Sequence, residues 1–137
     1  MTRTEIVELL RHHKLAVIAS IADNGAPQAA LVGVAVSEQL EIVLDTLTST
    51  RKFHNIVHDG RVALVMGEGE LTIQIEGHAD VPGGADLDRL HEVYFATYPD
   101  GRDRIAWPDI TWLRVRPTWI RVADYVADPP VIREQHL

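Results

Sequence analysis

The feature that most constrains the fold is a succession of short apolar segments rich in β-branched residues, each followed by a polar turn. The first, LAVIASIA, covers residues 15–22, and Asn24-Gly25 then supplies residues that accept the positive φ of a tight turn. A second apolar segment covers residues 28–37, so the two together predict a β-hairpin. Strands joined by tight turns pair antiparallel, and the pattern therefore favours a largely antiparallel sheet.

Four further strands and three helices complete the expected order. The strands are expected at 40–46, 61–67, 71–81 and 110–125, the last with a kink at Pro117. The helices are expected at 4–11, 48–60 and 85–96, with a turn-rich loop at 98–109. We therefore predict one domain over residues 1–137, an α+β, mostly β fold in which six antiparallel strands form a barrel-like sheet with flanking helices. The tail 127–137, which contains Pro129-Pro130, is expected to be loosely packed.

Composition limits the classes of function. The chain carries 13 Lys and Arg against 20 Asp and Glu, a net charge of −7, which argues against nucleic acid as the main partner. No apolar run reaches the roughly 20 residues that a membrane-spanning helix needs, so no membrane partner is expected. The absence of cysteine excludes disulfides, thiolate metal sites and thiol nucleophiles, and we expect a cytoplasmic protein.

The segment with the most chemical information is TLTSTRKFHN, residues 46–55. Over residues 15–60 the only Lys or Arg residues are the adjacent Arg51 and Lys52, in the first turn of an expected helix. The free N–H groups of a helix N-terminus disfavour cations there but attract an anion. These amides, two cations and the neighbouring hydroxyls of Thr48, Ser49 and Thr50 would converge on one phosphate. The alternative is a hydroxyl N-cap followed by two solvated cations, which would cost only about 0.3–1 kcal/mol each.

The order of these segments resembles the pyridoxamine-phosphate oxidase-like flavin-binding split barrels. The similar parts are the DNGAP turn between two strands, the strand LEIVLDT, the hydroxyl-Arg-Lys-x-x-Asn run in STRKFHNI, and RVALV. The resemblance extends from about Leu15 to Val81, and more weakly to Tyr125. It implies a six-stranded antiparallel split β-barrel in which Arg51, Lys52 and Ser49 or Thr50 hold the phosphate of FMN.

The resemblance also implies where the rest of the cofactor lies. The isoalloxazine ring would lie against the second and third strands, near Ala30, Leu31, Val32 and Gly33, and near Asp45 and Thr46. The small residues there also suit tight sheet packing, which stays open as an alternative. In such barrels the cofactor lies at a homodimer interface, so the partner subunit would contribute residues. The candidates are Thr72, Gln74, and Trp107 or Trp112, although lone tryptophans also serve as core or interface anchors.

The chain departs from the oxidases themselves in two places. They carry an Arg and a Lys on the second strand, where this chain has Ala30 and Ala35, and their C-terminal arginine motif is not recognisable in residues 114–125. The resemblance therefore implies a shorter relative that binds FMN and acts as a flavin-dependent oxidoreductase on an unidentified small molecule. No side chain stands out as an acid or base.

Two alternatives remain open, a reductase that uses the deazaflavin F420 and a non-enzymatic flavin-binding or redox-sensing module. F420 would need a basic groove, to which five arginines could contribute: Arg102, Arg104, Arg114, Arg116 and Arg121. We favour the interpretation that these are the polar face of a half-buried strand, with Arg114 and Arg116 alternating outward.

Seven histidines raise the question of a metal site. His54 and His58 are four residues apart and share a helix face, as chelating pairs do. No acidic residue or third histidine stands at a recognised spacing, so we expect a surface helix and no metal. A haem-binding relative of the same barrel class would use a histidine, which leaves haem as a distant alternative.

Overall fold

The computed structural model describes all 137 residues, which form eight strands, three α-helices and one 3₁₀ helix. The strands are β1 (Leu15–Ile21), β2 (Pro27–Gly33), β3 (Ala35–Val36), β4 (Ile42–Leu47), β5 (Arg61–Glu68), β6 (Leu71–Asp80), β7 (Ile110–Asp124) and β8 (Val131–His136). The helices are α1 (Arg3–Arg11), α2 (Arg51–His58) and α3 (Gly84–Thr97), followed by the 3₁₀ helix η1 (Pro99–Arg104).

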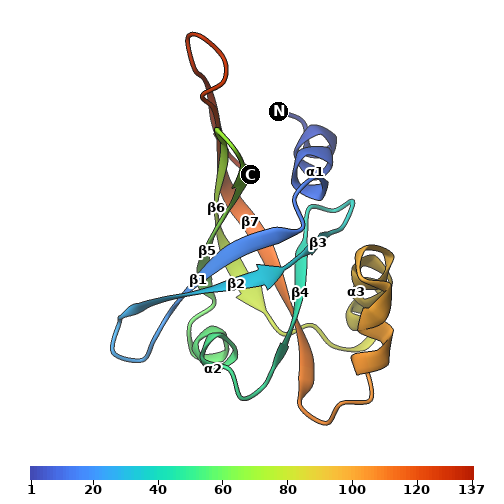
Figure 1. Ribbon diagram of the computed structural model, residues 1–137. Coiled ribbons are helices and arrows are strands. Elements are labelled where there is room, and N and C mark those ends of the chain that lie inside the picture. Colours follow the sequence, from blue (N-terminus) through green and yellow to red (C-terminus); the bar gives the residue numbers. More distant parts are fainter.

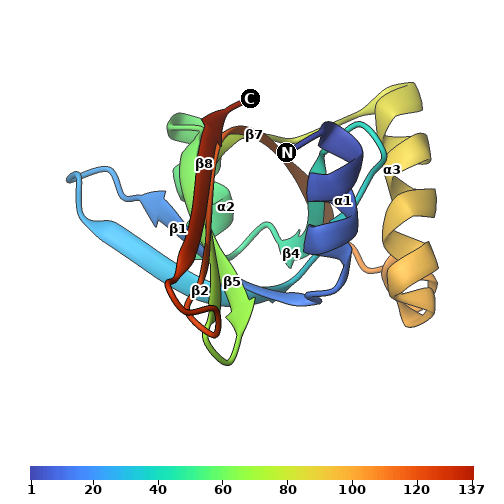
Figure 2. The same cartoon turned by 90° about the horizontal axis from the view of Figure 1, so that it is seen from above.

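All strands belong to one antiparallel sheet with the order β2-β1-β5-β6-β7-β4-β3, and β8 pairs with β7. The sheet curls into a half-barrel, with α1 at one end, α2 beside β1 and β2, and α3 outside β4 (Figure 1; Figure 2). The predicted fold class, a mostly β, α+β split barrel, is confirmed. None of the helices combines the length and the apolar character needed to cross a bilayer.

Pro117 marks the place where β7 changes partners. Before it, β7 pairs with β4, and beyond it with β8, while β6 follows β7 through both parts. The register of β6 against β7 shifts between Glu76 and Gly77, opposite Pro117. A Cβ on Gly77 would lie 2.6 Å from the Arg116 carbonyl oxygen, so the two backbones can approach this closely only at a glycine. The expected kink is therefore a β-bulge.

The strand count differs from the predicted six at two places. The expected strand at 28–37 divides into β2 and β3, because Val34 bonds to the Lys14 carbonyl and the chain then leaves β1 to pair with β4. The prediction of a loosely packed tail is wrong, since Val131–His136 pairs with Trp119–Asp124. The sequence VIREQH lacks a strong apolar alternation, and its strand conformation depends on the exposed edge of β7 beside it.

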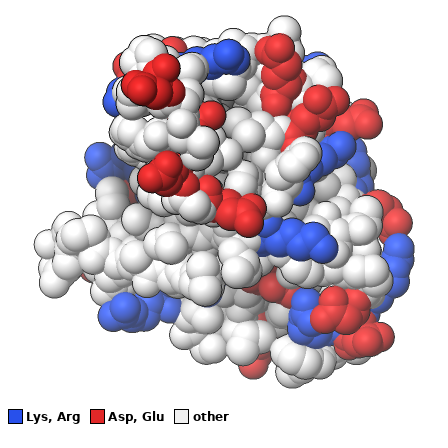
Figure 3. Space-filling view, turned by 45° about the horizontal axis from the view of Figure 1, so that its top comes forward, with Lys and Arg blue, Asp and Glu red and all other residues white.

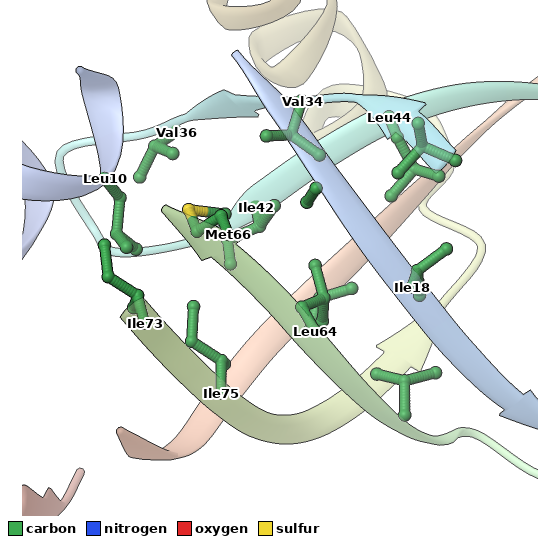
Figure 4. Close-up of a cluster of buried hydrophobic side chains, with 14 of the residues drawn as sticks. Leu10, Ile18, Val34, Val36, Ile42, Leu44, Leu64, Met66, Ile73 and Ile75 are labelled. Carbon is green, nitrogen blue, oxygen red and sulfur yellow. The ribbon is translucent and has the colours of Figure 1, made fainter. Parts of the chain in front are cut away.

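Two apolar cores lie on opposite faces of β4. The larger fills the inside of the curled sheet and is closed by α1, whose Leu10 points toward Ile42, Met66 and Ile73 (Figure 4). The smaller lies beneath α3 and packs Leu90, Tyr94 and Phe95 against Ala35, Val43 and Trp112. The two cores cover both faces of β4, whereas the outer face of β1, β2 and β5 carries no helix.

Candidate functional site

The N-terminus of α2 is built around Thr50. Its backbone is extended and its hydroxyl accepts the Phe53 N–H at 3.4 Å, so the helix begins at Arg51 and not at residue 48 as expected. The same hydroxyl donates to the Leu47 carbonyl at 2.9 Å and lies 2.9 Å from the hydroxyl of the buried Thr46. The helix supplies no acceptor for the amides of Arg51 and Lys52, which are therefore available to a ligand.

Arg51 and Lys52 lie in the first turn of α2, which contains no acidic residue. Seven of the arginines form ion pairs with carboxylates, but neither Arg51 nor Lys52 does. Lys52 is half-buried, and this burial lowers its pKa, an effect that Asp45 partly offsets. A half-buried ammonium beside unpaired amides and hydroxyls is an arrangement that an anion would stabilise.

Two adjoining hollows meet at the start of α2. A hollow of about 350 Å³ lies between residues 49–52 and the strands, where it is lined by Ile18, Gln28, Ala29 and Ala30. A groove of about 620 Å³ lies on the other side of the helix start, lined by Thr48, Ser49, Thr50, Arg51, His54 and Asn55 and by Ala22, Asp23, Asn24 and Gln28. The predicted phosphate residues Ser49, Thr50, Arg51 and Lys52 are thus brought together at one concave place facing β2.

Asn55 ties α2 to the hairpin opposite it. It is buried, and its amide donates to the Ser20 hydroxyl at 3.0 Å and to the Gln28 side-chain oxygen at 2.9 Å. Ser20, Gln28 and Asn55 were not among the predicted site residues, although Asn55 is the last position of the Arg-Lys-x-x-Asn run. Asn55 thereby holds α2 against β1 and β2, and its partner Gln28 lines both hollows.

Replacing Asn55 with alanine should destabilise the protein by about 1–3 kcal/mol, because the buried Ser20 hydroxyl loses its hydrogen-bond partner. The measurement is the free energy of unfolding in urea. The exposed Val57 on the same helix provides a control, and Val57→Ala should stay within about 0.5 kcal/mol of wild type. Equal losses of unfolding free energy in the two variants would contradict a stabilising role of the Asn55 hydrogen bonds.

The residues predicted to contact the flavin ring do not share one face. Leu31 points to the outer face of the sheet, whereas Val32 lies in the main core. A Cβ on Gly33 would lie 2.8 Å from the Tyr98 hydroxyl, which donates to the Lys14 carbonyl. The space beside Gly33 is thus occupied by the Tyr98 side chain from the end of α3.

Asp45 and Trp112 lie on the α3 side of β4, opposite Thr46. The Asp45 carboxylate accepts from Arg104 Nε at 2.9 Å and is directly opposite Trp112 in the β4–β7 register. Trp112 is buried in the smaller core, edge-on to Phe95, and its indole N–H has no partner. Trp107 is half exposed in the loop after η1. Trp112 thus packs within its own subunit, and only Trp107 is open to a partner.

Thr72 and Gln74 lie on the outward face of β6. Gln74 is paired with Val65, and the same row continues through Val17 to Leu31. Three of these four side chains are apolar and exposed, with Leu31 reaching 68%. The row therefore forms an uncovered apolar sheet face, which we call the outer face, with Gln74 at its edge.

The five arginines that could line a basic groove are all paired. Arg102 bonds to Glu92, Arg104 to Asp45, Arg116 to Asp80 and Arg121 to Glu134. The outward solvent exposure expected for Arg114 is wrong, since this residue is 5% exposed and bonds to Asp80 and Asp86 under α3. On the face shown in Figure 3, acidic and basic atoms lie interspersed. These arginines do not form a free basic groove.

Comparisons with known proteins agree with this architecture. A heme binding protein from Mycobacterium smegmatis superposes with a TM-score of 0.82 at 16% identity, covering 99% of this chain and 58% of its own. A protein related to general stress protein 26, of the pyridoxinephosphate oxidase family, from Clostridium acetobutylicum superposes with a TM-score of 0.69 at 17% identity. The match covers 96% of this chain and 93% of that protein. A pyridoxamine 5'-phosphate oxidase-related, FMN binding protein from Nostoc punctiforme superposes with a TM-score of 0.68 at 11% identity. The match covers 98% of this chain and 92% of that protein.

At these identities the likeness shows the fold, and the chain spans little more than half the length of the mycobacterial protein. No curated protein matches the sequence. The sequence model of the pyridoxamine 5'-phosphate oxidase family, in contrast, matches residues 2–124. That match contains seven of the eight strands, α2 and α3, and the chain therefore belongs to the pyridoxamine 5'-phosphate oxidase family.

Proposed function

We propose that this protein binds FMN, with the phosphate at the N-terminus of α2. The observation that carries the proposal is the half-buried Lys52, which has no carboxylate partner and lies beside Arg51 and the hydroxyls of Ser49 and Thr50. Free helix amides, two cations and hydroxyls are the groups that bind a phosphate dianion. Membership of a family with an FMN binding neighbour supports the same ligand.

We further propose that the protein is an oxidoreductase acting on a small molecule. FMN, when bound, supplies the hydride and electron chemistry, and the protein supplies binding and orientation. Residues 49–52 would hold the phosphate, and Ala30 of β2, which lines the same hollow, leaves room for the cofactor close to the sheet. No acid or base is assigned.

F420 is the less favoured cofactor, because the arginines available for its acidic tail are already neutralised by carboxylates. A titration of the apoprotein with FMN, riboflavin and F420 separates the candidates. We expect FMN to bind at least tenfold more tightly than riboflavin, which has no phosphate, and more tightly than F420. Equal affinities for FMN and riboflavin would refute the phosphate site.

An enzyme and a flavin-binding module differ in turnover. Addition of NADH or NADPH to the FMN-loaded protein should bleach the flavin absorbance, and oxygen or another acceptor should restore it. A flavin that stays oxidised with both donors would favour the non-enzymatic module. Both results are read from the same spectrum, independently of the substrate.

We propose that a homodimer completes the cofactor pocket through the outer face. Leu31→Glu would place a carboxylate at the most exposed apolar position of this surface and should weaken the dimer at least tenfold, as measured by sedimentation velocity. Val126 is even more exposed but lies in the β7–β8 connection, so Val126→Glu is the matched control. A wild-type monomer with full FMN affinity would show that no second subunit is needed.

A further inference from the structure

Three potential metal ligands meet where α2 faces the β1–β2 connection. His54 and His58 lie one turn apart on the exposed side of α2, and Asp23 reaches them from the connection. The nearest ligand atoms of the three side chains all lie within 4.8 Å of one another. His54 Nε2 is 3.0 Å from an Asp23 carboxylate oxygen, and the two imidazole centroids are 4.4 Å apart.

His58 makes a backbone hydrogen bond of the kind that metal-binding histidines make. Its Nδ1 lies 2.8 Å from the His54 carbonyl oxygen, which can only accept, so Nδ1 carries the proton. In the neutral ring the lone pair is then on Nε2. Metal-binding histidines commonly donate their other ring N–H to a backbone carbonyl in this way. The contact fixes both the tautomer and the ring orientation.

We propose that Asp23, His54 and His58 form a binding site for a divalent transition metal of the Zn²⁺ type. Two imidazoles and one carboxylate are a common zinc ligand set, whereas Mg²⁺ and Ca²⁺ prefer oxygen ligands only. Bond lengths of about 2.0–2.1 Å in a tetrahedron place ligand atoms roughly 3.3 Å apart. The side chains are exposed, so small rotations bring them from their present separation to this value.

The proposed site adjoins the groove at the start of α2. Asp23 and His54 line that groove together with Thr50 and Arg51. Three protein ligands leave a fourth coordination position for water or an anion. The metal site stands on its own ligands and does not depend on FMN binding.

The third ligand could not be found from local spacing. His54 and His58 form a recognisable pair, but Asp23 lies 31 residues before His54. The Asn55 bonds to Ser20 and Gln28 hold α2 against the two strands that the Asp23 connection joins. The expectation of no metal rested on sequence spacing alone, whereas tertiary packing places the Asp23 carboxylate beside His54.

Competition between the untagged apoprotein and a chromogenic zinc chelator tests the site with Zn²⁺ alone. We expect wild type to bind one Zn²⁺ at these residues, and His58→Ala and Asp23→Ala each to weaken binding at least tenfold. His12 is the matched control. Its Nδ1 also lies 2.8 Å from a backbone carbonyl four residues earlier, that of Glu8, but His12 does not belong to a cluster of potential ligands. His12→Ala should bind Zn²⁺ like wild type.

Thermal unfolding provides a second measurement that does not depend on the chelator. Zn²⁺ should raise the melting temperature of wild type and of His12→Ala, since a ligand that binds the folded state stabilises it, but not that of Asp23→Asn. Circular dichroism without metal identifies any variant that fails to fold, and Asp23→Asn keeps the size of the side chain. Equal Zn²⁺ affinity in wild type and His58→Ala, or a loss confined to His12→Ala, would overturn the proposal.

Discussion

Replacement of both Arg51 and Lys52 with alanine is expected to weaken FMN binding by a factor of about 10²–10⁴. Each charge-assisted hydrogen bond to the phosphate contributes about 1.5–3 kcal/mol, and tenfold in affinity corresponds to about 1.4 kcal/mol. Neither cation forms an ion pair, so the substitutions leave no carboxylate unpaired and the fold should be preserved. The helix amides and Thr50 remain, which explains why some affinity should persist.

Riboflavin makes this experiment specific to the phosphate. The double variant should bind riboflavin as wild type does, because riboflavin lacks the phosphate that the two cations would contact. Arg61 lies just beyond the other end of α2, exposed and paired with Asp59, and Arg61→Ala should leave the FMN affinity within about twofold. Fluorescence titration measures all these values. An unchanged affinity for FMN in the double variant would mean that the phosphate binds elsewhere.

Arg114→Ala should destabilise the protein by about 3 kcal/mol. The guanidinium is buried and bonds to Asp80 at 2.7 and 2.9 Å, to Asp86 at 3.1 Å and to Glu41 at 3.4 Å. It thereby joins β7 to β6, to α3 and to the turn before β4. Removing one member of a buried ion pair costs about 3–5 kcal/mol, because the partner is left uncompensated.

The lower end of that range applies because two other arginines remain. Arg89 keeps its bidentate contact with Glu41 at 2.8 and 3.0 Å, and Arg116 keeps its contact with Asp80 at 3.1 Å. Urea unfolding measures the loss. Arg116→Ala serves as the control, since its side chain is 56% exposed and surface pairs contribute at most about 1 kcal/mol. Comparable losses in the two variants would show that burial does not strengthen the Arg114 contacts.

The contribution of Arg114 to the free energy of unfolding should depend on pH. Hydrogen bonds from Arg114 hold the pKa values of Asp80 and Asp86 below their ordinary value, and Arg89 does the same for Glu41. These pKa values are lower in the folded than in the unfolded protein, so the stabilisation is complete above about pH 5 and is lost as pH falls further. The difference in stability between wild type and Arg114→Ala should therefore shrink below about pH 5. A gap that stays constant down to pH 2 would contradict the ion-pair explanation.

Local features of the sequence predicted most of the helices and strands and pointed to the proposed phosphate residues. The Asn24-Gly25 turn, the alternating apolar residues of β6 and the hydroxyl before Arg51 act within a few residues of one another. Turn geometry, strand alternation and helix capping depend on near neighbours, which is why they can be recognised in one sequence. The predicted phosphate residues 49–52 are consecutive, so forming α2 is enough to gather them.

The tertiary structure decided which of the other residues can act together. It separated Leu31 from Val32, because strand neighbours point to opposite faces of the curled sheet, and it placed Trp112 under α3. It also buried Arg114 among three carboxylates and brought Asp23 to His54 and His58.

By itself, then, the sequence determined the strand-rich order, the family pattern and the adjacency of the proposed phosphate residues. The packing of the sheet against its helices determined the outer face, the β8 pairing and the metal-ligand cluster. These features join residues far apart along the chain, and such contacts depend on how the sheet curls and where the helices dock. Local sequence propensity does not determine the curl of the sheet or the docking of the helices.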